Sequence, residues 1–558
     1  MFERNFELLG NDSLREKLDR ITIEQSSKHM SYCMTPSNDY LLMKDDVPLD
    51  DINNPREAIR EMLKSTIKQP MEANDIIITF GIGLCYLLDE VFNTYKSKIF
   101  IYEPDINILH FVLKNVDISD HLASGRVYIS CDLNELMRHL AETYITKDKV
   151  EIVYLKNYAI LRSQDLLQLT QKVYETCKTK MVDVNTIAKF SKKWLLNSLK
   201  NINTINNSTV YKLSDLEGKF TGQTALILAA GPSLSDDIEK IKQNRDKYVI
   251  FAVNKVLRVL NANGITPDFA VCMDAMAIEE SITGIADFCS KINCILDLKT
   301  DSSVLTAGFK RYFLTFSEND FVAKKLTDFN PALKAYEFGG SATTMAYVAA
   351  VKLGFSKIIF SGLDLAFKDN VMYSTGEVIN KVNDSQISLG YTNKNIIRVK
   401  SVTGGFVNTR DDYAAFIKHF EILLRDYKGA EVYNTSSFGA YIEGMKNVSF
   451  EQIPLFLSST GLPFILGEAK PFRIEIKEWT QNELFLINNV IALLSKGVFS
   501  PALVSSIVKS SLLYEYMQAD ILKVMQSKFD NELAESFIEK GKNAIKDVVE
   551  NLQKNRLI

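Results

Sequence analysis

Residues 225–274 decide the fold, because they hold three apolar runs that each end in a glycine or a polar residue. The runs are Ala225-Leu-Ile-Leu-Ala-Ala230 before Gly231-Pro-Ser233, Tyr248-Val-Ile-Phe-Ala-Val253 before Asn254, and Phe269-Ala-Val-Cys-Met273 before Asp274. Short apolar runs bounded in this way are typical of buried strands rather than helices. The stretch therefore predicts neighbouring strands of one buried sheet.

The turn Gly231-Pro232-Ser233 precedes a helical pattern, since Leu234, Ile238 and Ile241 recur at helical spacing. A glycine turn that leads from a strand into a helix N-terminus is a ready site for an anion, because free backbone N–H groups and the helix dipole point there. An ordinary strand-to-helix turn is the alternative for this triplet taken alone.

Further strands are predicted at 294–298, 310–315 and 357–361, with helical stretches between most of them. This alternation indicates a doubly wound α/β sheet, in which ligands bind outside the carboxyl ends of the strands. A second glycine turn, Phe338-Gly-Gly-Ser-Ala-Thr-Thr344, opens an alanine-rich helix and is a second candidate anion site. We expect both turns, Asn254, Asp274 and residues 361–364 to meet at one crevice.

The flanking regions predict two more domains. Residues 75–105 hold a strand, the turn Gly81-Ile-Gly83, a helix and a strand that ends in Glu103-Pro-Asp105. This pattern resembles a dinucleotide-binding fold, although the third glycine is missing and an unliganded scaffold is the alternative. Residues 474–558 read as helices. We predict a multidomain α/β protein with a Rossmann-like domain and helical linker at 1–205, a central doubly wound domain at 206–465 and a helical domain at 466–558.

Composition excludes several classes of protein. With 558 residues, 46% hydrophobic and 24% charged, the chain is typical of a globular protein, and its net charge of -4 argues against a general nucleic-acid binder. The longest apolar runs are too short to span a membrane. Seven cysteines without a C-x-x-C pair, and an N-terminus unlike a signal peptide, indicate a cytoplasmic location.

The central motifs carry a family resemblance. In order they are Ala-Gly231-Pro-Ser-Leu, Ala-Val-Asn254, Met-Asp274, Gly-Ser341-Ala-Thr-Thr, Phe-Ser-Gly362-Leu-Asp364 and Asn434-Thr-Ser-Ser-Phe-Gly-Ala. This series resembles the motility accessory factor family of flagellin glycosyltransferases, and the first domain is similar to that family as well. The central motifs are also similar to small bacterial sialyltransferases, which use CMP-sialic acid.

The resemblance implies a donor site and catalytic groups. It places the CMP donor against Gly231, Pro232, Ser233, Asn254, Asp274, Ser341, Thr343, Thr344 and Gly362. It places Asp364 under the base or ribose, and Tyr373 near the position where sialyltransferases use a tyrosine to stabilise the leaving phosphate. We expect Asp364, Tyr373 and Glu377 to be the catalytic residues. The sialyltransferases use a histidine base, but this chain has no histidine between 140 and 418, and His419 lies in a helical pattern. Asp364, Asp274 and Glu377 are the candidate bases.

The sequence therefore predicts a glycosyltransferase that moves a nonulosonic acid, pseudaminic or legionaminic acid, from a CMP donor to Ser or Thr hydroxyls of flagellin in bacterial motility. No D-x-D motif is present, and we expect neither a metal nor a cofactor. The oligomeric state stays open. Two alternatives remain: an ATP enzyme similar to archaeal hydroxymethylpterin pyrophosphokinases, and a non-catalytic flagellin-binding chaperone.

Overall fold

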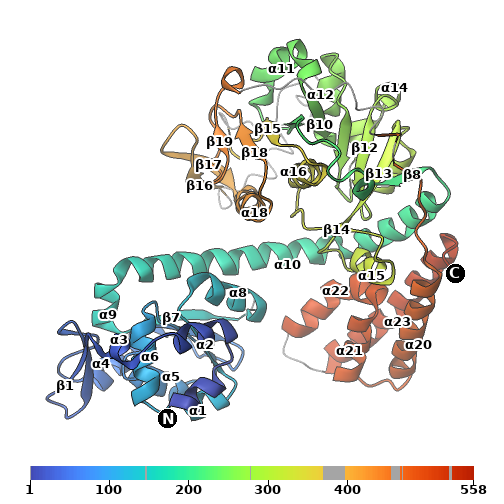
Figure 1. Ribbon diagram of the computed structural model, residues 1–558. Coiled ribbons are helices and arrows are strands. Elements are labelled where there is room, and N and C mark those ends of the chain that lie inside the picture. The colour runs from blue at the N-terminus through green and yellow to red at the C-terminus, as the bar shows by residue number, and fades with distance from the viewer. Residues whose placement is uncertain are drawn as a thin grey trace. The chain divides into compact units, whose positions relative to one another are not determined.

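The computed structural model describes residues 2–144, 148–276, 278–367, 396–453, 466, 467, 469–526 and 531–558. The chain forms two compact units, Met1–Asn185 and Thr186–Ile558. Helix α10 (Ser163–Asn206) contains the boundary between them (Figure 1). No helix in the described ranges has the length and apolar character needed to cross a bilayer.

The first unit is built on a parallel four-stranded sheet in the order β6-β5-β4-β7. Its strands β4 and β5 match the runs predicted there, and a small antiparallel sheet, β1-β2-β3, precedes them. The elements are α1 (Phe2–Leu8), α2 (Asp12–Asp19), α3 (Ile23–Ser27), β1 (Met30–Met34), β2 (Tyr40–Lys44), β3 (Val47–Pro48), α4 (Pro55–Thr66), β4 (Ile76–Phe80), α5 (Tyr86–Thr94), β5 (Lys98–Tyr102), α6 (Ile106–Asn115), α7 (Ser119–Ala123), β6 (Val127–Ser130), α8 (Leu133–Thr143), β7 (Val150–Tyr154) and α9 (Lys156–Leu161).

The second unit is built on a ten-stranded sheet in the order β14-β13-β12-β11-β10-β9-β15-β18-β19, with β8 also paired to β13. Strand pairs along it are parallel. The elements are β8 (Val210–Lys212), β9 (Thr224–Leu228), α11 (Leu234–Gln243), β10 (Val249–Val253), α12 (Leu257–Ala262), β11 (Phe269–Cys272), α13 (Glu279–Ile282), α14 (Ala286–Cys289), β12 (Asn293–Asp297), β13 (Arg311–Ser317), α15 (Phe321–Phe329), β14 (Ala335–Tyr336), α16 (Ala342–Leu353), β15 (Lys357–Ser361), β16 (Ile396–Lys400), β17 (Phe406–Arg410), α18 (Asp411–Asp426), β18 (Glu431–Asn434) and β19 (Lys446–Asn447).

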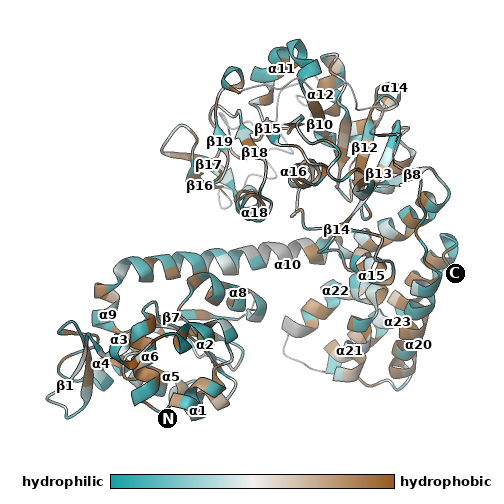
Figure 2. Cartoon of the chain, viewed as in Figure 1, coloured by the Kyte–Doolittle hydropathy of each residue, from teal (hydrophilic) through white to brown (hydrophobic). Residues whose placement is uncertain are grey.

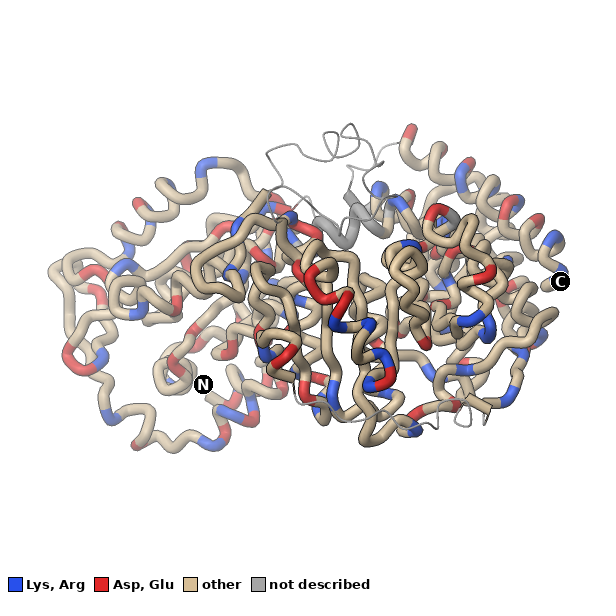
Figure 3. Tube along the Cα trace, turned by 90° about the horizontal axis from the view of Figure 1, so that it is seen from above, with Lys and Arg blue, Asp and Glu red and all other residues tan. Residues whose placement is uncertain are grey.

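The predicted multidomain α/β class, with parallel sheets and a helical C-terminus, is confirmed. Strands β9, β10 and β15 are buried along their whole length, as expected for apolar runs covered on both faces. Strand order reverses at β9, because the chain adds β10 to β14 on one side of it and β15 and β18 on the other. Figure 2 shows these strands as mainly hydrophobic, and Figure 3 shows charges of both signs spread along the trace.

The last four helices, α20 (Lys477–Leu494), α21 (Pro501–Lys509), α22 (Ser511–Gln526) and α23 (Asn531–Lys554), pack together and share one hydrophobic core with the central sheet. They belong to the same compact unit as that sheet, whereas the sequence predicts a separate domain from residue 466. The first unit also ends earlier than the predicted residue 205. Buried Asn201, close to the predicted boundary at residue 205, donates from Nδ2 to the carbonyls of Leu298 and Thr300, both at 2.8 Å.

A buried group of charges lies where the central sheet meets these helices. Lys299 Nζ is 4.0 Å from Asp297 Oδ2 and 3.9 Å from Asp320 Oδ2, and Lys299 also faces the ring of Trp194 at 4.7 Å. Glu515 of α22 is 3% exposed and is the third carboxyl group near Lys299, the one lysine of this group. Burial raises the pKa of Asp297, and burial together with Asp320 raises the pKa of Glu515 to about 8.

Replacing Glu515 with Gln should stabilise the second unit at alkaline pH. The unfolded carboxyl has a pKa near 4, so the folded state keeps this proton to higher pH and unfolding releases it between about pH 4 and 8. Stability from this group therefore falls as the pH rises through that window. At about pH 8.5 we expect Glu515→Gln to exceed the wild type by about 3–5 kcal/mol, and the difference should shrink as the pH falls and vanish only below about pH 4.

Urea unfolding followed by tryptophan fluorescence measures this effect, because both tryptophans, Trp194 and Trp479, lie in the second unit. Glu539→Gln, at an exposed position on α23, is the matched control and should leave the pH dependence unchanged. If the unfolding free energies of Glu515→Gln and the wild type depend on pH in the same way, ionisation of Glu515 does not destabilise the folded state.

Candidate functional site

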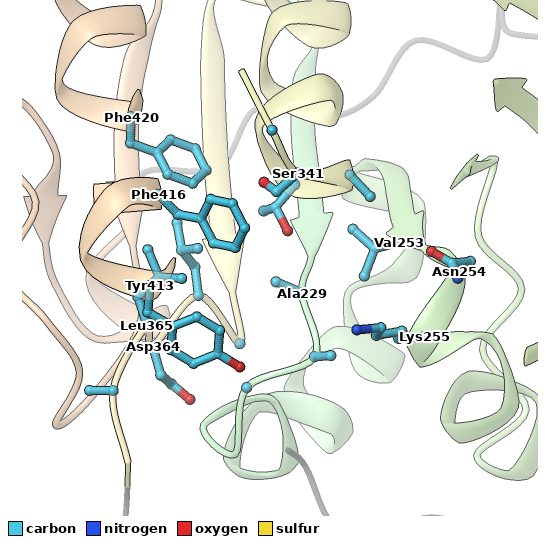
Figure 4. Close-up of a pocket in the computed structure, with 18 of the residues that line it drawn as sticks. Ala229, Val253, Asn254, Lys255, Ser341, Asp364, Leu365, Tyr413, Phe416 and Phe420 are labelled. Atoms are coloured by element: carbon cyan, nitrogen blue, oxygen red, sulfur yellow. The ribbon is translucent and has the colours of Figure 1, made fainter. Parts of the chain in front are cut away.

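A pocket lies at the carboxyl edge of the central sheet, where the strand order reverses. Loops after β9, β10, β11 and β15 line it together with the N-terminus of α16 and one face of α18 (Figure 4). Parallel strands end at the same edge, so residues far apart in sequence meet there. The pocket brings together seven of the predicted site residues: Gly231, Asn254, Asp274, Ser341, Thr343, Gly362 and Asp364.

The turn after β9 is held tightly against the turn after β15. The N–H of Gly231 donates to the carbonyl of Gly362 at 2.8 Å. A Cβ atom added at Gly231 would lie 2.5 Å from that carbonyl oxygen, so a larger residue does not fit. Gly362 has a φ of +78°, a conformation that glycine adopts without strain. Both glycines are therefore required by the approach of the two turns.

Asp364 fastens this turn to a third loop. Its Oδ2 accepts from the N–H of Ser233 at 2.9 Å, and its Oδ1 accepts from the hydroxyl of Ser436, which follows β18. The side chain is 1% exposed. A buried carboxylate is tolerated when protein donors replace its water shell. Asp364 lines the pocket, but its oxygens already accept hydrogen bonds within the protein, which indicates a positioning role rather than the expected catalytic one.

A second buried carboxylate repeats this arrangement one turn into α11. Asp237 Oδ2 accepts from the hydroxyls of Ser361, at 2.8 Å, and Thr435, at 2.6 Å. Burial raises the pKa of Asp237. The two carboxylates therefore tie α11 and its preceding turn to the ends of β15 and β18. The sequence predicts a site role for Asp364 but not for Asp237.

The predicted anion role of the first turn needs correction. Its N–H groups are used inside the protein: Gly231 donates to Gly362, Ser233 donates to Asp364, and Leu234 donates back to the carbonyl of Gly231. Ser233 is 2% exposed, and neither it nor Pro232 lines the pocket. This turn forms the floor of the pocket. The three N–H groups already donate within the protein, so they are not available to bind a phosphate.

The N-terminus of α16 keeps the features of an anion site. Ser341 caps the helix by accepting from the N–H of Thr344 at 3.1 Å, and Thr344 Oγ1 accepts in return from the N–H of Ser341. Thr344 is fully buried in this capping box and does not line the pocket. Ala342 and Thr343 do line it, and the first N–H groups of a helix have no partner within the helix.

Several lining residues are not among the predicted site residues, and Lys255, Tyr413 and Phe416 are the ones with charged or aromatic side chains that bear most on binding. Lys255 directly follows Asn254 at the end of β10, and Figure 4 shows it on the side of the pocket opposite Tyr413. Tyr413 and Phe416 occupy successive turns of α18. The sequence showed this spacing, but an aromatic stripe on a helix usually marks a core face. The fold decides that these rings border the pocket.

The candidate bases fall in different places. Asp274 is exposed and lines the pocket, and its carbonyl accepts from the N–H of Asp301 at 2.9 Å. Tyr373 and Glu377 lie outside the described residues. His419 of α18 is beside Gly339, with its ring carbon Cγ 3.5 Å from where a Cβ of Gly339 would be, and it does not line the pocket. Of the described candidates, Asp274 is the one placed at the pocket with an exposed side chain.

The glycine turn of the first unit is filled by the protein itself. A Cβ at Gly81 would lie 2.5 Å from the ring of Tyr158, and one at Gly83 would lie 2.8 Å from Leu155. Glu103, the acidic residue that follows β5, is fully buried and accepts from the N–H of Ile82 at 3.1 Å and from the hydroxyl of Tyr158. The groups that would contact a dinucleotide are occupied by side chains, as in the unliganded alternative.

Comparison with solved structures covers the whole chain. A Maf glycosyltransferase from Magnetospirillum magneticum AMB-1 superposes with a TM-score of 0.67 at 16% sequence identity, covering 100% of this chain and 94% of that one. The chain has the fold of this Maf glycosyltransferase. The resemblance expected from the motifs is therefore confirmed at the level of the fold, and it covers both units of this chain.

Sequence comparisons match the central region. A family model described as 6-hydroxymethylpterin diphosphokinase MptE-like matches residues 196–370, which include the strands from β8 to β15 and most of the pocket. An uncharacterized protein from Treponema pallidum (strain Nichols) is 28% identical over 167 residues, or 29% of this chain and 78% of that protein. Both sequence matches cover a smaller part of this chain than the structural match to the Maf glycosyltransferase does.

Asp364→Ala should destabilise the second unit. Without the carboxylate, the N–H of Ser233 and the hydroxyl of Ser436 lose their acceptor in a buried position. The expected loss is about 2–4 kcal/mol in urea unfolding, with a smaller loss for Asp364→Asn, which keeps one acceptor oxygen. Glu239→Ala, at an exposed position on α11, is the control. If the urea midpoint of Asp364→Ala equals that of the wild type, Asp364 does not hold the turns in position.

Proposed function

We propose that this protein is a glycosyltransferase that moves a nonulosonic acid, pseudaminic or legionaminic acid, from its CMP donor to Ser or Thr hydroxyls of flagellin in the cytoplasm. The single observation that carries the proposal is the pocket at the sheet reversal, within a chain that shares its fold with a Maf glycosyltransferase. The donor, the sugar and flagellin come from the motif resemblance.

The pocket has the chemistry that a nucleotide sugar needs. The N-terminus of α16 offers backbone N–H groups and the Ser341 and Thr343 hydroxyls, and Lys255 adds a positive charge. On the opposite wall, Tyr413 and Phe416 offer aromatic surface for a base or a sugar ring. We assign the donor phosphate to the side of Lys255 and Asn254.

The reaction would proceed by attack of an acceptor hydroxyl on the anomeric carbon. The bond from that carbon to the phosphate oxygen breaks, CMP leaves with the electron pair, and the hydroxyl proton passes to a base. Lys255 would stabilise the charge that develops on the phosphate. Asp274 is the described carboxylate that could take the proton. We propose no metal and no further cofactor for this reaction.

The pterin pyrophosphokinase alternative is favoured by the family model that matches residues 196–370. Such an ATP enzyme would need carboxylates in the pocket to hold magnesium. The pocket contains Asp274 and Asp364, but Asp364 already accepts from Ser233 and Ser436. The coverage of the whole chain by the Maf fold supports the glycosyltransferase instead.

Lys255→Ala should weaken CMP binding by about tenfold or more, because a charge-assisted contact contributes about 1.5–3 kcal/mol and each 1.4 kcal/mol is tenfold. Lys255→Arg should retain most of the affinity. Calorimetry with CMP measures the effect, with ATP as the competing ligand. Lys242→Ala, at an exposed position on α11 that does not line the pocket, is the control. ATP bound in preference to CMP would instead support the pyrophosphokinase.

Asp274→Asn should reduce transfer to flagellin by about 100-fold, the effect expected when a general base is lost, with CMP affinity nearly unchanged. The fold should persist, because Asp274 is exposed and its anchor to Asp301 uses the backbone carbonyl. Intact-mass analysis of flagellin after reaction with a CMP-nonulosonic acid gives the rate. A wild-type rate in this variant would rule out Asp274 as the base.

A further inference from the structure

The hairpin of β16 and β17 has two chemically different faces. Arg398 pairs with Asn408 and Lys400 pairs with Phe406, so these four side chains share one face, and all four are exposed. The other face carries Val399, Val407 and Thr409. Val399 and Val407 pack against the central core, and Thr409 is buried.

The inner face joins the hairpin firmly to the wall of the pocket. The hydroxyl of Thr409 donates to the carbonyl of Leu365 at 2.7 Å, and the N–H of Phe367 donates to the carbonyl of Asn408 at 3.0 Å. At the hairpin turn, the N–H of Val402 donates to the carbonyl of Gly439 at 3.0 Å. The hairpin is therefore fixed to the two segments that Asp364 and Ser436 hold together (Figure 1).

The outer face combines positive charge with apolar surface. Phe406 is 62% exposed, and the guanidinium of Arg398 lies 5.4 Å from its ring centre. Neither Arg398 nor Lys400 forms an ion pair with another described residue, whereas the chain as a whole carries a net charge of -4. From the end of β17, Arg410 stacks on Tyr413, which lines the pocket.

We propose that this outer face, made of Arg398, Lys400, Phe406 and Asn408, docks an acidic segment of the acceptor protein that also presents an apolar side chain. The inference rests on the proposed function, since the acceptor must reach the pocket that the hairpin borders. Two cations that have no acidic partner among the described residues attract an acidic segment, and the exposed ring gives it an apolar anchor. Asn408 can exchange hydrogen bonds with the backbone of the docked segment.

The test compares charge reversals at two places on the same unit. Arg398→Glu combined with Lys400→Glu reverses the proposed surface. Lys242→Glu combined with Lys310→Glu makes the same change in net charge at exposed positions, on α11 and just before β13. We expect the first double variant to bind purified flagellin at least tenfold more weakly at low salt, and the second to bind it like the wild type. The difference should shrink at high salt because exposed charges are screened.

Phe406→Ser tests the apolar anchor, with Phe485→Ser on α20 as its matched control because Phe485 is 63% exposed. We expect a three- to tenfold rise in the Kd for flagellin in the Phe406 variant alone, measured by the same binding assay. This range corresponds to about 0.7–1.4 kcal/mol. CMP affinity by calorimetry should stay unchanged in all these variants, since none of the four hairpin residues lines the pocket.

The outcomes separate this inference from the proposed function. Loss of flagellin binding in both hairpin variants supports docking, even if CMP does not bind and the enzyme proposal fails. Flagellin affinity equal to that of the wild type overturns docking, even if transfer chemistry is confirmed. Absence of flagellin binding by the wild type also overturns it. The last control uses vesicles of anionic phospholipid: hairpin-dependent binding to vesicles without hairpin-dependent binding to flagellin assigns the surface to a membrane and overturns the proposal.

Discussion

The buried carboxylate of Asp364 is the interaction on which the pocket depends. It follows β15, accepts from Ser233 in the turn after β9, and accepts from Ser436 in the loop after β18. Three neighbouring strand ends are joined through one side chain. A carboxylate at this depth is stable only because protein donors replace water. The loops therefore stabilise the charge, and the charge holds the loops in place. Gly231 and Gly439 allow the approach, because a Cβ at either would collide with this segment.

This arrangement gives the pocket a hydrogen-bonded floor and two chemically different walls. The floor is the turn at Gly231, whose N–H groups serve the fold. One wall is the N-terminus of α16 with Lys255 and Asn254 nearby, and the other is the aromatic face of α18. The hairpin of β16 and β17 is bonded to Leu365 in the segment after β15, and its last residue, Arg410, contacts Tyr413. A partner docked on the hairpin would therefore be held in a fixed relation to the pocket.

The two glycine turns of this chain show how one sequence pattern can have two outcomes. Gly81 and Gly83 follow β4 as Gly231 follows β9, and an acidic residue, Glu103, stands where a dinucleotide fold would have one. In the first unit, Tyr158 and Leu155 fill the space beside the glycines, and Glu103 bonds to Ile82 and Tyr158. In the second unit the space above the glycine turn stays open as the pocket. What fills the space comes from distant residues, and local spacing carries no information about it.

The sequence alone determined the central strands and their alternation with helices, which is typical of a parallel sheet. It also determined the convergence of Gly231, Asn254, Asp274, Ser341 and Asp364. These follow from local apolar runs and from the rule that parallel strands end at one edge. Only the tertiary structure decided which polar groups form hydrogen bonds within the protein, as Ser233, Thr344 and Asp364 do, and which side chains face the pocket, as those of Lys255 and Tyr413 do. The reason is physical: a donor or a carboxylate becomes structural or functional according to the partner it meets, and that partner can lie far away in the chain, as Asp364 lies from Ser233.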